Sequence, residues 1–355
     1  MLAMRPFVVA LLVVGTAGSA RAQDAPQEPA VASGSDALSP PSSVTPSPPP
    51  AKPPMTGTFS VGASYRSDDG FAAKLGVGQS DLFHTGLGLY LDSSLSERVQ
   101  HSSMKLVDPH LANGRLTLSG EIYSDRRLLG DTGFRRDAVG AEVDLSTKLA
   151  DHMHAFVGYR LEAVDITGTL AWLRAGAGYS TLDQVVAPTR GTSAGVTVGV
   201  ADAAYGSDDN LARLDAWFST HQRVGPFIFH TGGRFAAVAG LGDPSGVPFT
   251  EALFFGGSTD IRGFSFGDGP GAYSPGNVLG TWRTSLELPI AGGVSVRGFW
   301  DAGGIFDWSG TGTIAQSVGG GVLWRSPIGP ISVDYAVPFV GDSPRILLGI
   351  GKSFD

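Results

Sequence analysis

The chain contains no cysteine among its 355 residues. It therefore forms no disulfide, offers no thiolate to a metal and carries no lipid anchor on cysteine. Charged residues are scarce at 16%, and the formal net charge of -8 leaves no basic surface to neutralise the phosphates of a nucleic acid. Beyond Ala22 no apolar run reaches the roughly 18 residues that a transmembrane helix needs. The composition argues against a nucleic-acid partner and against membrane-spanning helices.

Two segments precede the expected folded domain. Residues 1–22 are typical of a secretory signal peptide, with an apolar centre at Phe7–Val14 and an A-x-A cleavage site at Ala20–Ala22. Residues 23–56 are rich in proline, serine and alanine, which predicts an extended tether that buries no core. We expect the tether to lie in the periplasm and the folded domain to span residues 57–355.

From residue 57 onward, apolar and polar side chains alternate over segments of about ten residues, separated by glycine, aspartate, asparagine and serine. The segment Leu279–Ile290 illustrates the pattern. One face carries Trp282, Leu286, Leu288 and Ile290, and the other carries Arg283, Ser285 and Glu287. Alternation of this kind predicts β-strands with one apolar face.

The side that meets water distinguishes two all-β folds. A soluble sandwich turns its apolar faces inward, whereas a membrane barrel turns them to lipid and lines a wet lumen with polar side chains. The secretory signal, the strand lengths and the charges of both signs on one face favour the barrel, because a cation facing lipid would cost roughly 2–4 kcal/mol at the midplane. We therefore predict an all-β transmembrane antiparallel barrel of about 16 strands, with both chain ends in the periplasm.

Short turns and one long loop separate the predicted strands. The loop lies between the eleventh and twelfth strands, from about Ala239 to Asn277, and contains the glycine- and aromatic-rich stretch Phe254–Phe266. A long loop that holds an arginine in such a setting is expected to dock onto the protein. The expected strands are 57–65, 71–79, 82–93, 98–107, 114–123, 135–147, 152–163, 168–180, 190–202, 209–221, 226–238, 277–290, 292–303, 316–326, 329–338 and 345–354.

The centre of this loop resembles a signature of the bacterial surface antigen superfamily, the outer-membrane barrels of BamA- and TamA-type assembly factors and two-partner secretion transporters. The matching residues are Ile261, Arg262, Gly263 and Phe264, preceded by Phe255–Ser258. Other stretches resemble family signatures in the same order: Asp108-Pro109, Pro188–Gly191, Phe299–Gly303, Ser326–Pro330 with Asp334-Tyr335, and Ile350–Phe354.

The resemblance implies an outer-membrane barrel whose arginine loop folds back into the lumen. Family members usually carry periplasmic POTRA domains before the barrel, and here the proline-rich tether occupies that place, so we expect a barrel without POTRA domains. Members also commonly end on an aromatic residue, whereas this chain ends on Asp355. Recognition of the chain end by the assembly machinery is therefore expected to differ slightly.

Strand parity supplies partners for the loop arginine. Glu287 and Asp301 fall on the inward faces of adjacent strands, and two carboxylates can hold the Arg262 guanidinium through charge-assisted hydrogen bonds. In a wet lumen such a clamp would contribute about 1–3 kcal/mol. Two interpretations remain open: the clamp positions the loop for a function, or it locks the loop for purely structural reasons. Neither makes these residues catalytic.

The closing strand carries a second candidate feature. Leu348, Ile350 and Phe354 share the lipid-facing parity, Gly351 falls on the other, and Lys352 can extend its ammonium to the membrane edge. This strand is expected to serve as the signal for barrel insertion and as one side of a weak seam with the first strand. Ordinary barrel closure explains the same residues equally well.

We therefore expect a protein that inserts or translocates proteins at the outer membrane. The alternatives are a passive or gated solute pore and a structural or anchoring barrel. The expected partners are the lipid bilayer with lipopolysaccharide, the outer-membrane assembly machinery, and client or periplasmic proteins. No enzyme activity, cofactor or metal is expected, because the seven histidines lack metal-type spacing and the G-x-S-x-G string at Gly191–Gly195 opens an alternating strand.

Overall fold

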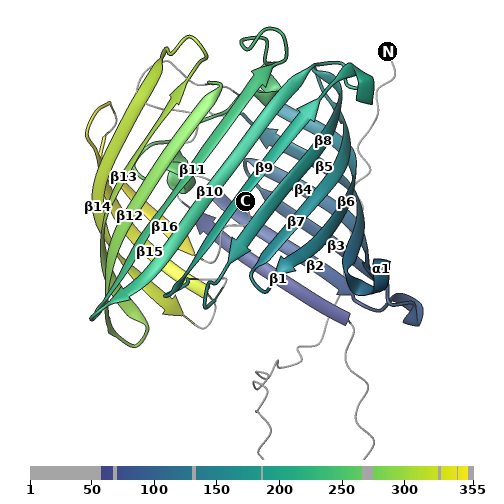
Figure 1. Cartoon of the computed structure of the whole chain (residues 1–355). Coiled ribbons are helices and arrows are strands. Elements are labelled where there is room, and N and C mark those ends of the chain that lie inside the picture. Colours follow the sequence, from purple (N-terminus) through teal and green to yellow (C-terminus); the bar gives the residue numbers. More distant parts are fainter. Residues whose placement is uncertain are drawn as a thin grey trace, which may run out of the picture. The chain divides into compact units, whose positions relative to one another are not determined.

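Sixteen antiparallel strands close into a barrel in which each strand pairs with its neighbours in the sequence and β1 pairs with β16 (Figure 1). The computed structural model describes residues 57–66, 70–129, 133–184, 187–265, 275–326, 329–341 and 343–350. The predicted signal peptide and tether lie outside these residues. The predicted all-β barrel with 16 strands is confirmed.

The strands follow the predicted segments closely. The first eight are β1 Gly57–Arg66, β2 Gly70–Gln79, β3 Gly88–Ser96, β4 Val99–His110, β5 Leu116–Leu128, β6 Arg135–Ala150, β7 Met153–Val164 and β8 Gly168–Ser180. The other eight are β9 Gly191–Ala201, β10 Leu211–Val224, β11 Phe227–Gly240, β12 Val278–Ala291, β13 Val294–Phe306, β14 Gly312–Ser326, β15 Gly329–Pro338 and β16 Arg345–Ile350.

The predicted strand boundaries differ most from the observed ones at the start of the third strand. The strand expected at 82–93 begins only at Gly88, because Leu82–His84 form the short 3-10 helix η1. The Asp81 carboxylate accepts the Gly86 N–H at 2.8 Å, and Leu82 N–H donates to Leu87 O at 2.7 Å. These local hydrogen bonds hold a turn where apolar alternation alone suggested a strand.

The remaining helical elements are short. They are α1 Leu111–Gly114, η2 Ala203–Tyr205, η3 Phe249–Glu251 and α2 Gly257–Asp260. None of the described helices is long and apolar enough to cross a membrane. Both η3 and α2 belong to the long loop between β11 and β12, which was predicted at that place in the strand order.

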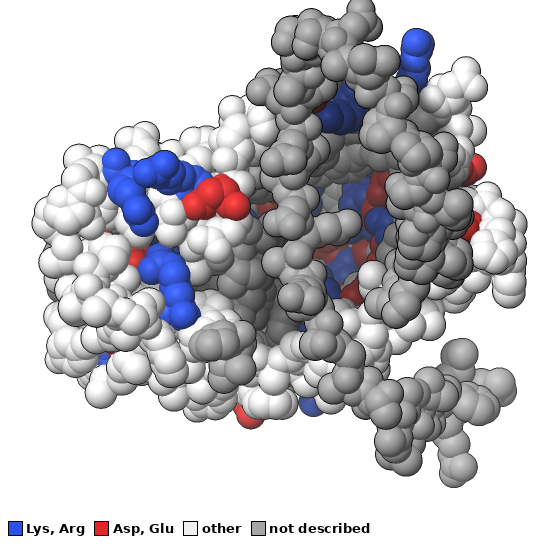
Figure 2. Space-filling model, turned by 90° about the horizontal axis from the view of Figure 1, so that it is seen from below, with Lys and Arg blue, Asp and Glu red and all other residues white. Residues whose placement is uncertain are grey.

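The two faces of the wall differ in polarity as the alternation predicted. Trp282, Leu286, Val296 and Trp300 on β12 and β13 point outward and are 39–47% exposed. Charged side chains of both signs gather inside the opening of the barrel (Figure 2). Since an exposed apolar band is stable only against lipid, the wall is built to lie in a bilayer.

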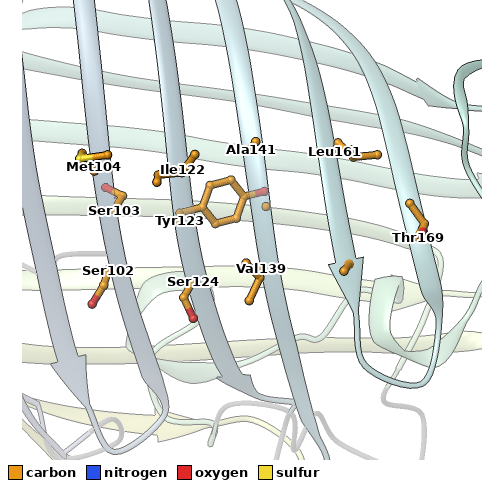
Figure 3. A pocket seen from close by; sticks show the side chains of 12 residues that line it. Ser102, Ser103, Met104, Ile122, Tyr123, Ser124, Val139, Ala141, Leu161 and Thr169 are labelled. Atoms are coloured by element: carbon orange, nitrogen blue, oxygen red, sulfur yellow. The ribbon is translucent and has the colours of Figure 1, made fainter. Parts of the chain in front are cut away.

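The outer wall over β4–β8 has an open groove of about 730 Å³, where serine, alanine and threonine side chains alternate with larger apolar ones (Figure 3). Ser102 and Ser124 are register partners on β4 and β5, with Ile122 two residues away on the same face. The next residue, Tyr123, faces the lumen, where its hydroxyl donates to the Glu162 carboxylate on β7. The adjacent residues Ile122 and Tyr123 of β5 thus face the lipid and the lumen, respectively.

Candidate functional site

The long loop after β11 enters the barrel and forms a hydrophobic core with the inner wall. Four loop side chains, Leu253, Phe255, Ile261 and Phe264, are at most 4% exposed. They pack against inward wall residues of β11–β14, which are Ala236, Val238, Leu279, Ile305 and Ala315. Burial of this apolar surface at about 25 cal/mol per Å² holds the loop inside the lumen.

Glycines give the loop its compact turn. Gly256 and Gly257 have φ angles of 111° and 81°, and Ile261 N–H donates to Gly257 O at 3.0 Å across the single turn of α2. Gly263 has φ 97°, and a Cβ there would lie 3.3 Å from Ala336 and from Pro338 of β15. Glycine therefore lets the backbone approach β15 directly beside the arginine.

Arg262 is clamped onto Asp301 of β13. Its Nε and one terminal nitrogen each donate to the carboxylate at 2.7 Å, and its backbone N–H donates to the same group at 3.1 Å. The guanidinium carbon lies 3.6 Å from the ring centroid of Phe299, two residues earlier on the same face of β13. The planar guanidinium donates two hydrogen bonds to one carboxylate and stacks on an aromatic ring, and lysine can reproduce neither contact as well.

The expected second partner of Arg262 was wrong. Glu287 accepts from both terminal nitrogens of Arg325 on β14 instead, and the same arginine reaches Ser295. Its inward parity was predicted correctly, but the residue of β12 opposite Asp301 is Arg283. Glu287 lies four residues further along the strand, roughly 13 Å away. Parity identifies the face of a strand and does not fix the level in the barrel.

The clamp is also drier than expected. Asp301 is 0% and Arg262 is 5% exposed, because the loop brings its own hydrophobic side chains into the lumen. Asp301 has a further cationic neighbour in Arg283, with 3.9 Å between Arg283 Nε and the Asp301 carboxylate. Arg234 lies 3.6 Å from Asp260, on the loop turn. Loop and wall thus meet through several opposite charges around one buried pair.

The closing strand lies as its parity predicted. Leu347 is buried beside Phe299, whereas Ile346 is 68% exposed, and Leu348 and Ile350 share the outward face with Ile346. Predicted signal residues Gly351, Lys352 and Phe354 lie outside the described residues. Within the described part of the chain, β1 and β16 pair at Tyr65↔Ile350 and Arg66↔Gly349, whereas β15 and β16 share six register pairs.

The loop also contacts the closing strand. Arg345, the first residue of β16, donates to the Ser265 hydroxyl three residues after Arg262. Sequence reasoning missed this contact, since a serine in a glycine-rich loop carries no signal of its own. It missed a second one as well, between Glu251 of the loop and Arg136 of β6. The inward parity of Arg136 was readable, but nothing in the loop marks Glu251 as buried.

The described residues contain no group of three or more histidines, aspartates or glutamates arranged to hold a metal ion. The carboxylates of Glu251, Asp260, Glu287 and Asp301 instead form ion pairs with arginines. The site is therefore a set of ion pairs and apolar contacts that place a loop, and its parts define a membrane barrel with a lumen-docked arginine loop.

Comparison with known proteins agrees with this class. Residues 81–354 match the Omp85 superfamily domain, and the chain belongs to that superfamily. Two curated relatives are outer membrane protein assembly factors named BamA. The protein from Neisseria meningitidis is 24% identical over 80% of this chain and 44% of its own length, and that from Nitratidesulfovibrio vulgaris is 23% identical over 80% and 39%. The chain thus spans less than half the length of these two relatives.

Solved structures show the same fold. BamA from Haemophilus ducreyi lacking POTRA domains 1–3 superimposes with a TM-score of 0.73 at 20% identity, covering 83% of this chain and 70% of that one. CdiB from Escherichia coli gives a TM-score of 0.55 at 14% identity, covering 84% and 63%. The predicted membership in the surface antigen and BamA-type superfamily is confirmed, and a barrel of this family implies the bacterial outer membrane.

Proposed function

We propose that this protein inserts proteins into the outer membrane, using its barrel wall and the seam between β1 and β16. The observation that carries the proposal is the combination of a loop docked inside the lumen with a closing strand that the loop touches. A loop that occupies the lumen favours work at the wall over passage of solutes through the centre. The names of the BamA relatives support the same class of activity.

The chemistry at the seam is hydrogen bonding between strand edges. An unpaired strand edge is a template on which another chain can add a strand. Among the described residues, β1 and β16 meet at the register pairs Tyr65↔Ile350 and Arg66↔Gly349, which are the strand edges that would separate to receive a client strand. Ser265 and Arg345 join the loop to β16, which lets loop position influence the seam.

The direct test is a folding assay in liposomes. An unfolded outer-membrane barrel is added to vesicles with and without this protein, and the folded fraction is followed by its altered migration on unboiled gels. The proposal predicts faster folding with the protein present. Equal rates in loaded and empty vesicles would contradict it and would leave a structural or anchoring barrel as the better account.

The solute-pore alternative makes a different prediction. A pore gives steady conductance in a planar bilayer whether or not it speeds folding, whereas a docked loop predicts a largely closed wild-type channel. Steady wild-type conductance without any acceleration of folding would favour the pore. The two measurements together separate the two functions.

A further inference from the structure

The first half of the lumen loop is attached to the wall at a place separate from Arg262. Glu251, at the end of η3, is 3% exposed, and its carboxylate accepts from Arg136 Nε of β6 at 2.9 Å. The neighbouring Thr250 hydroxyl hydrogen-bonds to Thr167 in the turn between β7 and β8. Arg213 of β10 lies 4.0 Å from the same carboxylate. Burial of Glu251 is thus compensated by charge and by hydrogen bonds.

The wall holds Arg136 in place independently of the loop. Arg136 donates to Glu162 of β7 at 2.8 Å, and Glu162 also accepts from Tyr123, which reaches across from β5 (Figure 3). The arginine therefore keeps a carboxylate partner when Glu251 is removed. A charge-removing change at Glu251 alters the loop contact and leaves the Arg136–Glu162 ion pair intact, whereas a change at Arg136 would also remove a partner of Glu162 within the wall.

Apolar contacts reinforce this attachment. The Phe249 ring meets Phe134 edge-on at 5.4 Å and Phe254 at 5.5 Å, beside a cavity of about 420 Å³. Val247 packs against the core described above and against a second cluster on the other strands. That second cluster is Ala138, Val164, Leu170, Trp172, Ala201 and Leu211. Val247 thus lies where both apolar clusters meet the loop.

The two attachments lie on nearly opposite walls. Arg136 belongs to β6 and Asp301 to β13, which are seven strands apart in one direction around the closed ring and nine in the other. A loop fixed at both places crosses the lumen, whereas a loop fixed only at Asp301 would be free to swing on one side.

We propose that Glu251 is a second positioning residue, which holds the first half of the loop against β6 so that the loop bridges the lumen. Loss of this contact frees Pro248–Glu251 from the β6–β8 side while Arg262 stays bound to Asp301. The lumen then opens in two steps, first at the β6–β8 wall and then at the β13 wall. The role of the second attachment in insertion rests on the proposed function. The attachment itself does not, because loop position is measurable without a client protein.

The test uses the absence of cysteine in the chain. A Val247→Cys reporter is introduced into the full chain, and its rate of reaction with a water-soluble maleimide is measured in liposomes. Glu251→Gln is expected to raise that rate roughly tenfold or more, because the amide that replaces the carboxylate no longer offers Arg136 a charged acceptor. The matched control is Glu121→Gln, because Glu121 is a lumen carboxylate of β5 paired with Lys105, 3.5 Å away, in the wall. The control should leave the labelling rate unchanged.

Equal labelling rates in Glu251→Gln and Glu121→Gln would overturn the inference. Heat-modifiable migration on gels reports that each variant has folded. If Glu251→Gln does not fold, Thr250→Val removes only the hydroxyl contact with Thr167 and should still raise labelling; an unchanged rate there would also overturn it. Faster labelling without any client-folding activity would support the second anchor and contradict the proposed function, so the two failures are distinguishable.

Discussion

Arg262 and Asp301 are 39 positions apart in the chain, yet three hydrogen bonds and a shared aromatic neighbour join them inside the barrel. The arginine comes from a loop and the aspartate from the centre of a strand. Their pairing therefore determines where the loop lies relative to the wall. Because both side chains are buried, neither can exchange its partner for water without moving the loop.

The first prediction concerns the loss of this pair. Asp301→Asn leaves a buried arginine without its counter-charge, which costs about 3–5 kcal/mol. We expect the loop to undock, so that trypsin cleaves after Arg262 at a rate well above that of the wild type, as read by mass spectrometry of the fragments. Glu287→Gln is the control, since Glu287 pairs with Arg325 and should leave Arg262 protected. Equal protection of Arg262 in all three proteins would contradict the clamp.

The second prediction concerns backbone strain at Gly263. An alanine there would need φ near 97° and would press on Ala336 and Pro338, at a cost of about 1–2 kcal/mol. We expect Gly263→Ala to speed hydrogen exchange in the peptide 255–265 by about 5- to 30-fold. Gly120→Ala is a suitable control, because a Cβ on Gly120 meets no atom within 4 Å. Slow exchange in both variants would argue against a conformational need for glycine.

The third prediction tests which face of the wall meets lipid. Trp300 lies midway along β13 and points outward, so Trp300→Arg should cost about 2–4 kcal/mol and lower the urea midpoint of unfolding. Ser103 lies midway along β4 and faces the lumen, and Ser103→Arg should change the midpoint little. The reverse order of the two midpoints would contradict the assignment of inside and outside.

The fold was largely predictable because apolar and polar side chains alternate along the strands. This alternation is required because one face of each strand meets lipid and the other meets the lumen. Parity alone placed Arg283, Glu287 and Asp301 on the inner face, and the structure agrees. The level of each residue in the barrel depends on strand register, which no single strand encodes. That is why Asp301 meets Arg262 and Glu287 does not. Loop contacts such as Glu251 with Arg136 were hidden for a related reason, since a loop has no period to read.

The fourth prediction concerns pH and the turn between β8 and β9. The hydroxyl of Thr189 donates to Asp183 at 2.6 Å, and with the N–H groups of Thr189 and Arg190 it lowers the pKa of this carboxyl to about 2. A depressed pKa means that the turn gains stability from Asp183 above about pH 4, its unfolded value. That contribution is lost as pH falls towards 2.

Carboxyl NMR titration in micelles checks this directly. The wild-type Asp183 should titrate near pH 2, and Thr189→Val should raise its midpoint because the strongest donor is removed. A wild-type midpoint near 4 would show that the hydrogen bonds do not persist in solution.

The seam provides the most direct test of how the barrel acts. Tyr65 and Ile350 are register partners on β1 and β16, so Tyr65→Cys with Ile350→Cys can form a disulfide across the seam in a chain that has no other cysteine. Val333→Cys with Leu348→Cys is the matched control between β15 and β16. The decisive measurement is the rate of client-barrel folding in liposomes with each pair oxidised and then reduced. The account predicts that oxidation stops acceleration only for the seam pair and that reduction restores it. Full acceleration with the seam disulfide closed would contradict an insertion mechanism that opens β1 from β16.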